Sequence, residues 1–297
     1  MEEHKNSDAQ AIIDVVERLY APETFNIIGN ECSPAPGITV LFKPKGMDIV
    51  DIQSQLDQRA TTPRRAKGNV NADTLDSFIA LVERHASENT VIYVDGLTKL
   101  VAVLNDNGKG NLPQWRDHRV LYKITASKEW DEWTGNSDKQ LSVLDFAKLL
   151  ENRCLDIMSP KSVGSKTAEI IERLGVRVGE PVAIQGLAKG LSLNVKREVQ
   201  EVRHLDSGET ELVFKEQHNR RDNVVTPNAF VIAIPVVVGG PAYTLVVRLR
   251  YKLDDAHITW SFKVVHSDMA VQDAIQDMIE TLRTRLPGVL VVEGTTP

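Results

Sequence analysis

Four ionisable side chains stand in a row, directly before an apolar run, in the segment QWRDHRVLY at residues 114–122. An arginine guanidinium can bind an anion through paired hydrogen bonds, and a histidine can donate or accept a proton near neutral pH. In an extended strand, Arg116 and His118 lie on one face, because residues two positions apart point the same way. These two residues are therefore candidate anion- or partner-binding groups at the rim of a strand that enters the core at Val120.

The same row also has a purely structural interpretation. Asp117 and Arg119 share the opposite face, where they are predicted to form a structural ion pair at a sheet edge or a subunit contact. We favour this interpretation, because charged strand ends are common and usually solvated. His118 has no nucleophile near it in the sequence, so it is weak evidence for catalysis.

A second candidate binding site is the loop that precedes residue 68. Arg59, Arg64, Arg65 and Lys67 form the densest basic cluster of a chain whose formal net charge is −6. Such a loop can clamp a phosphate or an acidic partner surface. The alternative is a solvated loop that only interrupts a sheet edge.

A third basic group is predicted on the outer face of a strand at residues 243–253. Arg248, Arg250 and Lys252 alternate there with apolar residues, and Lys263 extends the group. Sheet faces that bind single-stranded nucleic acid also carry aromatic side chains for stacking, whereas Tyr243 falls on the opposite face by parity. We interpret this face as solvated.

The sequence contains no established catalytic, metal or cofactor signature. SPKSVGSKT at residues 159–167 differs from a phosphate-binding loop, because Ser159 replaces the first glycine and Ser165 separates Gly164 from Lys166. Neither a zinc-binding HExxH pattern nor a GxSxG nucleophile elbow occurs. The prediction is therefore no catalytic residue, no metal and no cofactor.

The composition is that of an ordinary globular protein, with 42% hydrophobic and 26% charged residues in a chain of 297. The negative net charge disfavours a protein whose main task is to coat a polyanion. Cys32 and Cys154 are far apart and fit a reducing compartment, so the expected location is the cytoplasm. No segment is long and apolar enough to predict a membrane span or a membrane partner.

Hydrophobic periodicity predicts an α+β fold. A mixed part at residues 1–160 contains an antiparallel meander, a helical connection follows at 161–185, and residues 186–297 form an antiparallel sheet packed by one helix. These parts are either separate domains or one continuous unit. The principal expected strands are 38–42, 91–94, 99–104, 115–124, 191–202, 211–214, 230–238, 243–253, 258–265 and 289–292.

The segment at 230–238 is apolar at both odd and even positions. An antiparallel sheet with one solvated face would leave half of these side chains exposed. This pattern predicts a homo-oligomer.

Three segments, LVERHASENTVIYVDG, WRDHRVLYKI and FVIAIPVVVGGPAYTLVVRLRYKL, together resemble the YfdQ-like family of phage and prophage proteins, a domain of unknown function. The resemblance implies a cytoplasmic protein encoded among phage accessory genes for DNA metabolism or conflict with the host. The family has no established catalytic residues, so it supplies none for this chain.

The expected function is that of a non-enzymatic, self-associating phage accessory protein that acts by binding. Its candidate partners are a host protein, a nucleotide or nucleic acid. The alternative is an enzyme acting on nucleotides or phosphates, with residues 116–119 lining the site and the loop at Arg64 and Arg65 serving as a lid.

Overall fold

The computed structural model describes residues 14, 23–27, 38–42, 50–51, 65–107, 114–206, 208–214, 223–254 and 257–296. The chain divides into two compact units, Met1–Lys67 and Gly68–Pro297. The first unit contains an antiparallel sheet in the order β1-β2-β3, formed by Glu23–Ile27, Ile38–Phe42 and Val50–Asp51. The strand predicted at 38–42 is confirmed.

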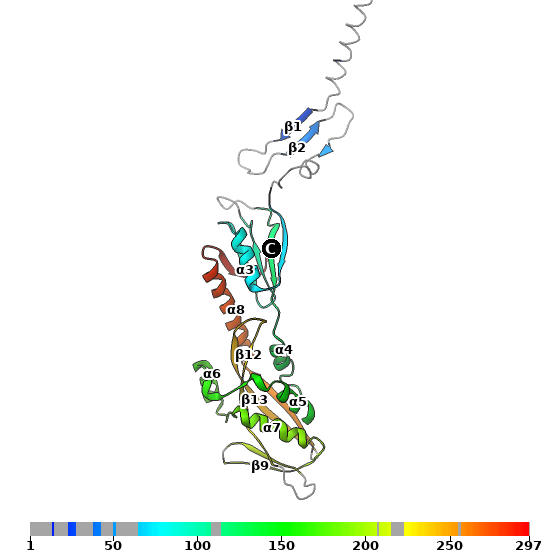
Figure 1. Ribbon diagram of the computed structural model, residues 1–297, viewed down its shortest axis with the longest axis vertical. Coiled ribbons are helices and arrows are strands. Elements are labelled where there is room, and N and C mark those ends of the chain that lie inside the picture. The colour runs from blue at the N-terminus through cyan, green and yellow to red at the C-terminus, as the bar shows by residue number, and fades with distance from the viewer. Residues whose placement is uncertain are drawn as a thin grey trace, which may run out of the picture. The chain divides into compact units, whose positions relative to one another are not determined.

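The second unit begins with a five-stranded sheet in the order β15-β5-β6-β7-β4. Figure 1 shows this part of the ribbon next to the label α3 (Leu75–His85). Its centre is the predicted antiparallel meander, and parallel strands flank it on both sides. The strands are β4 (Gly68–Ala72), β5 (Val91–Asp95), β6 (Lys99–Val103), β7 (His118–Lys123) and β15 (Leu290–Glu293).

Helix α3 (Leu75–His85) covers one face of this sheet. Its N-terminus is capped by Thr74, whose hydroxyl accepts a hydrogen bond from the backbone N–H of Ser77 at 3.1 Å. Phe78 and Val82 on its inner side are fully buried. Val120 and Tyr122 on β7 are buried on the same side, as alternation along the strand predicts.

A four-stranded sheet in the order β14-β13-β12-β8 forms the other half of this unit. Its three long strands are antiparallel neighbours. The strands are β8 (Ile157–Met158), β12 (Ala229–Pro235), β13 (Ala242–Asp254) and β14 (His257–Val265), and β8 lies between the short 3-10 turns η2 (Cys154–Asp156) and η3 (Pro160–Ser162).

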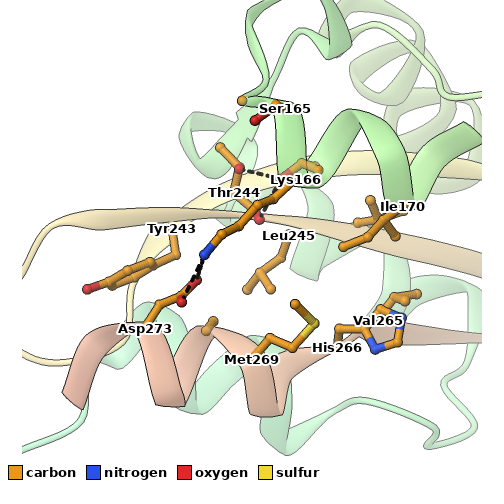
Figure 2. Close-up of a pocket in the computed structure, with 14 residues that line it drawn as sticks. Ser165, Lys166, Ile170, Tyr243, Thr244, Leu245, Val265, His266, Met269 and Asp273 are labelled. Atoms are coloured by element: carbon orange, nitrogen blue, oxygen red, sulfur yellow. Dashed lines mark hydrogen bonds and ion pairs between the residues drawn. The ribbon is translucent and has the colours of Figure 1, made fainter. Parts of the chain in front are cut away.

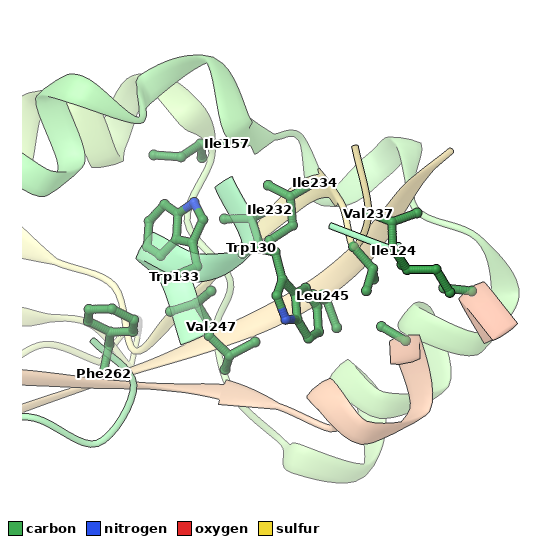
Figure 3. Close-up of a cluster of buried hydrophobic side chains, with 14 of the residues drawn as sticks. Ile124, Trp130, Trp133, Ile157, Ile232, Ile234, Val237, Leu245, Val247 and Phe262 are labelled. Atoms are coloured by element: carbon green, nitrogen blue, oxygen red, sulfur yellow. The ribbon is translucent and has the colours of Figure 1, made fainter. Parts of the chain in front are cut away.

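Aromatic side chains fill the core on one face of this sheet, below α4 (Lys128–Gly135) and α5 (Val143–Asn152) (Figure 3). The ring of Trp133 lies 5.5 Å from that of Phe262, and Phe146 stacks on Trp260 at 5.0 Å. Burying such rings supplies much of the hydrophobic stabilisation of a domain. The two helices are therefore anchored to the sheet by aromatic contacts.

The strand expected at 191–202 is wrong in its first part. Helix α7 (Pro181–Leu193) follows α6 (Ser165–Leu174), and the strand β9 starts only at Val199. A β-carbon on Gly190 would lie 2.7 Å from a methyl of Val224, so this glycine permits the close approach of α7 to the strand that carries Val224. Strands β9 (Val199–His204), β10 (Thr210–Phe214) and β11 (Asn223–Thr226) form a small antiparallel sheet.

Both faces of β12 are covered within one chain, which removes the reason given above for expecting an oligomer. Phe230 and Ile232 are buried on one face, and Val231 is buried on the other.

Helix α8 (Ser267–Arg285) leads from β14 back to the five-stranded sheet, where β15 pairs with β5. Strand β15, at the place of the strand expected at 289–292, thus belongs to the five-stranded sheet and not to the four-stranded sheet of β12, β13 and β14. The fold class is α+β, as predicted.

Candidate functional site

The row at 114–119 is tied into the fold by an ion pair that the sequence did not suggest. Arg116 Nε lies 2.9 Å from Oδ1 of Asp106, and the hydroxyl of Tyr93 donates to the same oxygen at 3.2 Å. Burial and the Asp106 carboxylate both raise the pKa of Tyr93. Arg116 has a φ of 53°, a conformation that few side chains adopt, so β7 starts at His118 rather than at Trp115.

Asp117 and Arg119 have separate partners. The side-chain amide of Asn105 donates to Oδ1 of Asp117 at 3.0 Å, and its oxygen accepts from the backbone N–H of His118 at 3.1 Å. Arg119 Nε donates to the backbone oxygen of Arg116 at 2.6 Å. These bonds fix the backbone at the start of the strand.

His118 points to the α3 side of the sheet, where its ring meets that of His85 edge-on at 5.7 Å. Arg65 and Lys67 are exposed residues of the first unit. Arg59 and Arg64 lie outside the described residues, as does Cys32. The strand that follows the loop starts at Gly68, which pairs with His118.

The four-stranded sheet presents a second charged surface on the side away from the aromatic core. Its cations are Arg248, Arg250 and Lys252 on β13 and Lys263 on β14, all exposed, and we call them the basic sheet face. Arg248 pairs across the strands with Lys263. The two positions that face the other cations carry hydroxyls, since Ser261 faces Arg250 and Thr259 faces Lys252.

Half of this face has acidic neighbours. Lys263 Nζ lies 3.6 Å from Asp138, and Lys252 Nζ lies 3.7 Å from Asp254. Within the described part of the chain, neither Arg248 nor Arg250 forms an ion pair. Two guanidiniums are therefore available for an anionic ligand.

A groove of about 1070 Å³ lies on another part of this unit, between the start of α3, the turn at 237–241 and α8. Its rim includes Asp73, Asp277 and Glu280, and the hydroxyl of Tyr243 donates to Asp277 at 2.6 Å. Burial and this carboxylate raise the pKa of Tyr243, so the tyrosine stays protonated.

A smaller hollow of about 340 Å³ lies between α6, β13 and the first turns of α8 (Figure 2). Lys166 reaches from α6 to Asp273 on α8, with Nζ 3.0 Å and 3.1 Å from the two carboxylate oxygens. The glycine-serine-lysine-threonine run thus forms the start of a helix, and its lysine already has a protein partner.

A metal site needs several ligating side chains close together, and a membrane span needs a long apolar helix. No three His, Cys, Asp or Glu side chains among the described residues gather closely enough to hold a metal ion. Across the same residues, no helix is long and apolar enough to cross a membrane.

Comparison with known proteins gives one match. A family model described as "Uncharacterized conserved protein (DUF2303)" matches residues 13–296. The chain belongs to the DUF2303 family. No curated protein and no solved structure matches it.

Sequence reasoning missed the residues that organise this DUF2303 chain most directly. Asp106 lies in a loop ten residues before Arg116, and no periodic pattern connects the two. The groove along α8 is built by four segments that are distant in the sequence, at 73–76, 122–125, 237–243 and 274–285, so no single window of sequence contains it. The helical spacing of Asp277 and Glu280 indicates only its α8 wall.

Proposed function

We propose that this chain is a non-enzymatic accessory protein of a phage or prophage, of the YfdQ-like kind, that acts in the cytoplasm by binding nucleic acid through the basic sheet face. The observation that carries the proposal is the pair Arg248 and Arg250, exposed and without ion pairs among the described residues. Arginine binds phosphate oxygens through paired hydrogen bonds, and such contacts supply sequence-independent affinity.

The net charge of −6 is compatible with this function because the cations are gathered on one face. A local patch on an acidic protein orients the ligand, since phosphates are repelled from the other surfaces. The face carries hydroxyls between its cations and no aromatic platform, which favours contact with the phosphate backbone over stacking of bases.

The enzyme alternative lacks support of this kind. Arg116, Asp117 and Arg119 already have hydrogen-bond partners within the chain. Self-association remains part of the proposal. Its support is now the edge strand β15, where Leu290 is 59% exposed.

The direct test is fluorescence anisotropy with a labelled oligothymidylate of about twenty nucleotides and a duplex of similar length. The double variant Arg248→Gln with Arg250→Gln should bind about tenfold more weakly, as expected for two surface charge contacts. The matched control is Arg84→Gln with Arg283→Gln, which removes two exposed arginines elsewhere. Equal losses in both double variants, or no binding at low salt, would reject the proposal.

A further inference from the structure

The two hollows beside α8 share Tyr243 as a wall, so they lie next to each other along the helix. The larger, at about 1070 Å³, is slightly above the roughly 300–1,000 Å³ of typical small-molecule pockets, so its size allows a short peptide segment. Its floor is apolar and consists of Leu75, Val237, Val238, Pro241, Ala274 and Met278. Val238 is 60% exposed, so the floor is open to a partner.

The α8 wall of this groove is acidic. Asp277 and Glu280 are three residues apart on α8 and both line the groove. Asp273, one turn earlier on the same side of the helix, lines the smaller hollow beside it. Asp73 continues the acidic rim on the segment before α3. A negative potential of this kind selects positively charged ligands.

The chain's own cations show which chemistry fits this rim. Lys166 binds Asp273 at one end of the two hollows, and Arg285 binds Asp76 at the other. Among the described residues, the carboxylates between these two ion pairs have no such partner: the Asp277 carboxylate accepts from the Tyr243 hydroxyl, and Glu280 forms no ion pair. Asp277 and Glu280 thus lie between an ion pair in the smaller hollow and one at the far end of the groove, without a lysine or arginine partner in the part of the chain that the structure describes.

We propose that the groove is a docking surface for a basic peptide segment of a protein partner. Lysine or arginine side chains of the segment would pair with Asp277, Glu280 and Asp73, and an apolar side chain between them would cover Val238. Apolar contact at the centre with charges around it is the usual arrangement of a protein interface. Nucleic acid does not fit here, because the rim would repel its phosphates.

The site is separate from the basic sheet face, so the two proposals can fail independently. The probe is a fluorescein-labelled heptapeptide of alternating lysine and leucine, with the glutamate-leucine peptide of the same length as its counterpart. The protein variant Asp277→Asn with Glu280→Gln should bind the lysine peptide about fivefold more weakly, the loss expected for two exposed charge pairs. Asparagine at 277 retains an acceptor for the Tyr243 hydroxyl.

The matched control is Glu83→Gln with Glu172→Gln, which removes the same charge from exposed positions outside the groove. Val238→Ser should weaken the lysine peptide as well, because it removes apolar contact without changing charge. Thermal melting confirms that each variant is folded.

Equal weakening by the groove and control variants would mean non-specific attraction and would overturn the proposal. So would the absence of binding, or equal affinity for the glutamate peptide. The groove variants could instead have a lower mass in solution than the wild type. In that case the occupant is a second copy of this chain, and the proposed partner is wrong.

Discussion

The guanidinium of Arg116 lies 2.9 Å from the carboxylate of Asp106, a residue only 3% exposed. A buried carboxylate is costly unless a cation or several donors satisfy it. The arginine that first looked like a ligand-binding group therefore has a structural task. Together with Tyr93, it ties Asp106 to the residues that directly precede β7.

Removing that cation should destabilise the fold. Arg116→Gln leaves Asp106 with the Tyr93 hydroxyl as its remaining side-chain donor among the described residues, so the free energy of unfolding should fall by about 2 kcal/mol. Urea denaturation measures the loss. Arg84→Gln on the exposed last turn of α3 is the control, and its effect should stay within about 0.5 kcal/mol. Similar losses in the two variants would show that the pair contributes little.

The carboxyl of Asp156 gives a pH dependence. Burial raises its pKa, although Trp133 donates to it at 2.8 Å and favours the charged form. The folded protein therefore holds this proton to higher pH than the unfolded chain does, so this group favours folding at low pH. Its contribution is lost as the pH rises from the unfolded towards the folded pKa.

Asp156→Asn keeps an acceptor for Trp133 and cannot ionise. The stability of the wild type relative to this variant should therefore decrease as the pH rises above the ordinary aspartate pKa of about 4 towards the raised pKa of the folded state. Urea titrations at several pH values give the comparison. A difference that is constant, or that increases with pH, contradicts the assignment.

Salt dependence tests the basic sheet face in a second way. For single strands, the logarithm of the affinity falls against the logarithm of salt concentration by about 0.7 for each phosphate neutralised. The Arg248→Gln and Arg250→Gln double variant should therefore have a slope shallower by about 1.4 than the wild type. An unchanged slope would mean that these arginines contact no phosphates.

Self-association is testable by light scattering against the monomer mass of 33.0 kDa. We expect a heavier particle, and Leu290→Lys on the edge strand β15 should reduce its mass without changing the melting temperature, because an edge lysine opposes strand pairing. The control is Leu155→Lys, at a residue 95% exposed elsewhere. A charge on the apolar segment at 230–238 would not serve as a test, because Val237, for example, is buried and an aspartate there would unfold the protein. If the wild type has the mass of a monomer, the proposed self-association is wrong.

Local patterns predicted the parts of this fold that depend on local physics. The hairpin of β5 and β6 follows from two apolar runs around a tight turn, and β13 follows from strict alternation, with Arg248 and Arg250 outside as expected. Helix α7 was misjudged because apolar residues and glycines obscure its period. Its helical state is set by packing against α5 and β11, which no local window contains.

The candidate sites divide in the same way. Exposure of the basic sheet face could be predicted, because parity along one strand determines it. The partner of Arg116 could not, since the loop that carries Asp106 has no regular spacing. The groove along α8 depends on how four distant segments meet.

The pairing of β15 with β5 brings Leu290 beside Val91. These two residues are far apart in the sequence, so the ribosome adds them at very different times. During translation the five-stranded sheet must wait, with the edge of β5 uncovered, until the residues of β15 have left the ribosome. The four-stranded sheet has all its strands earlier, since β14 ends at Val265. A nascent chain should therefore complete the four-stranded sheet first. Until β15 emerges, the unpaired edge of β5 is the place where a chaperone would be needed most.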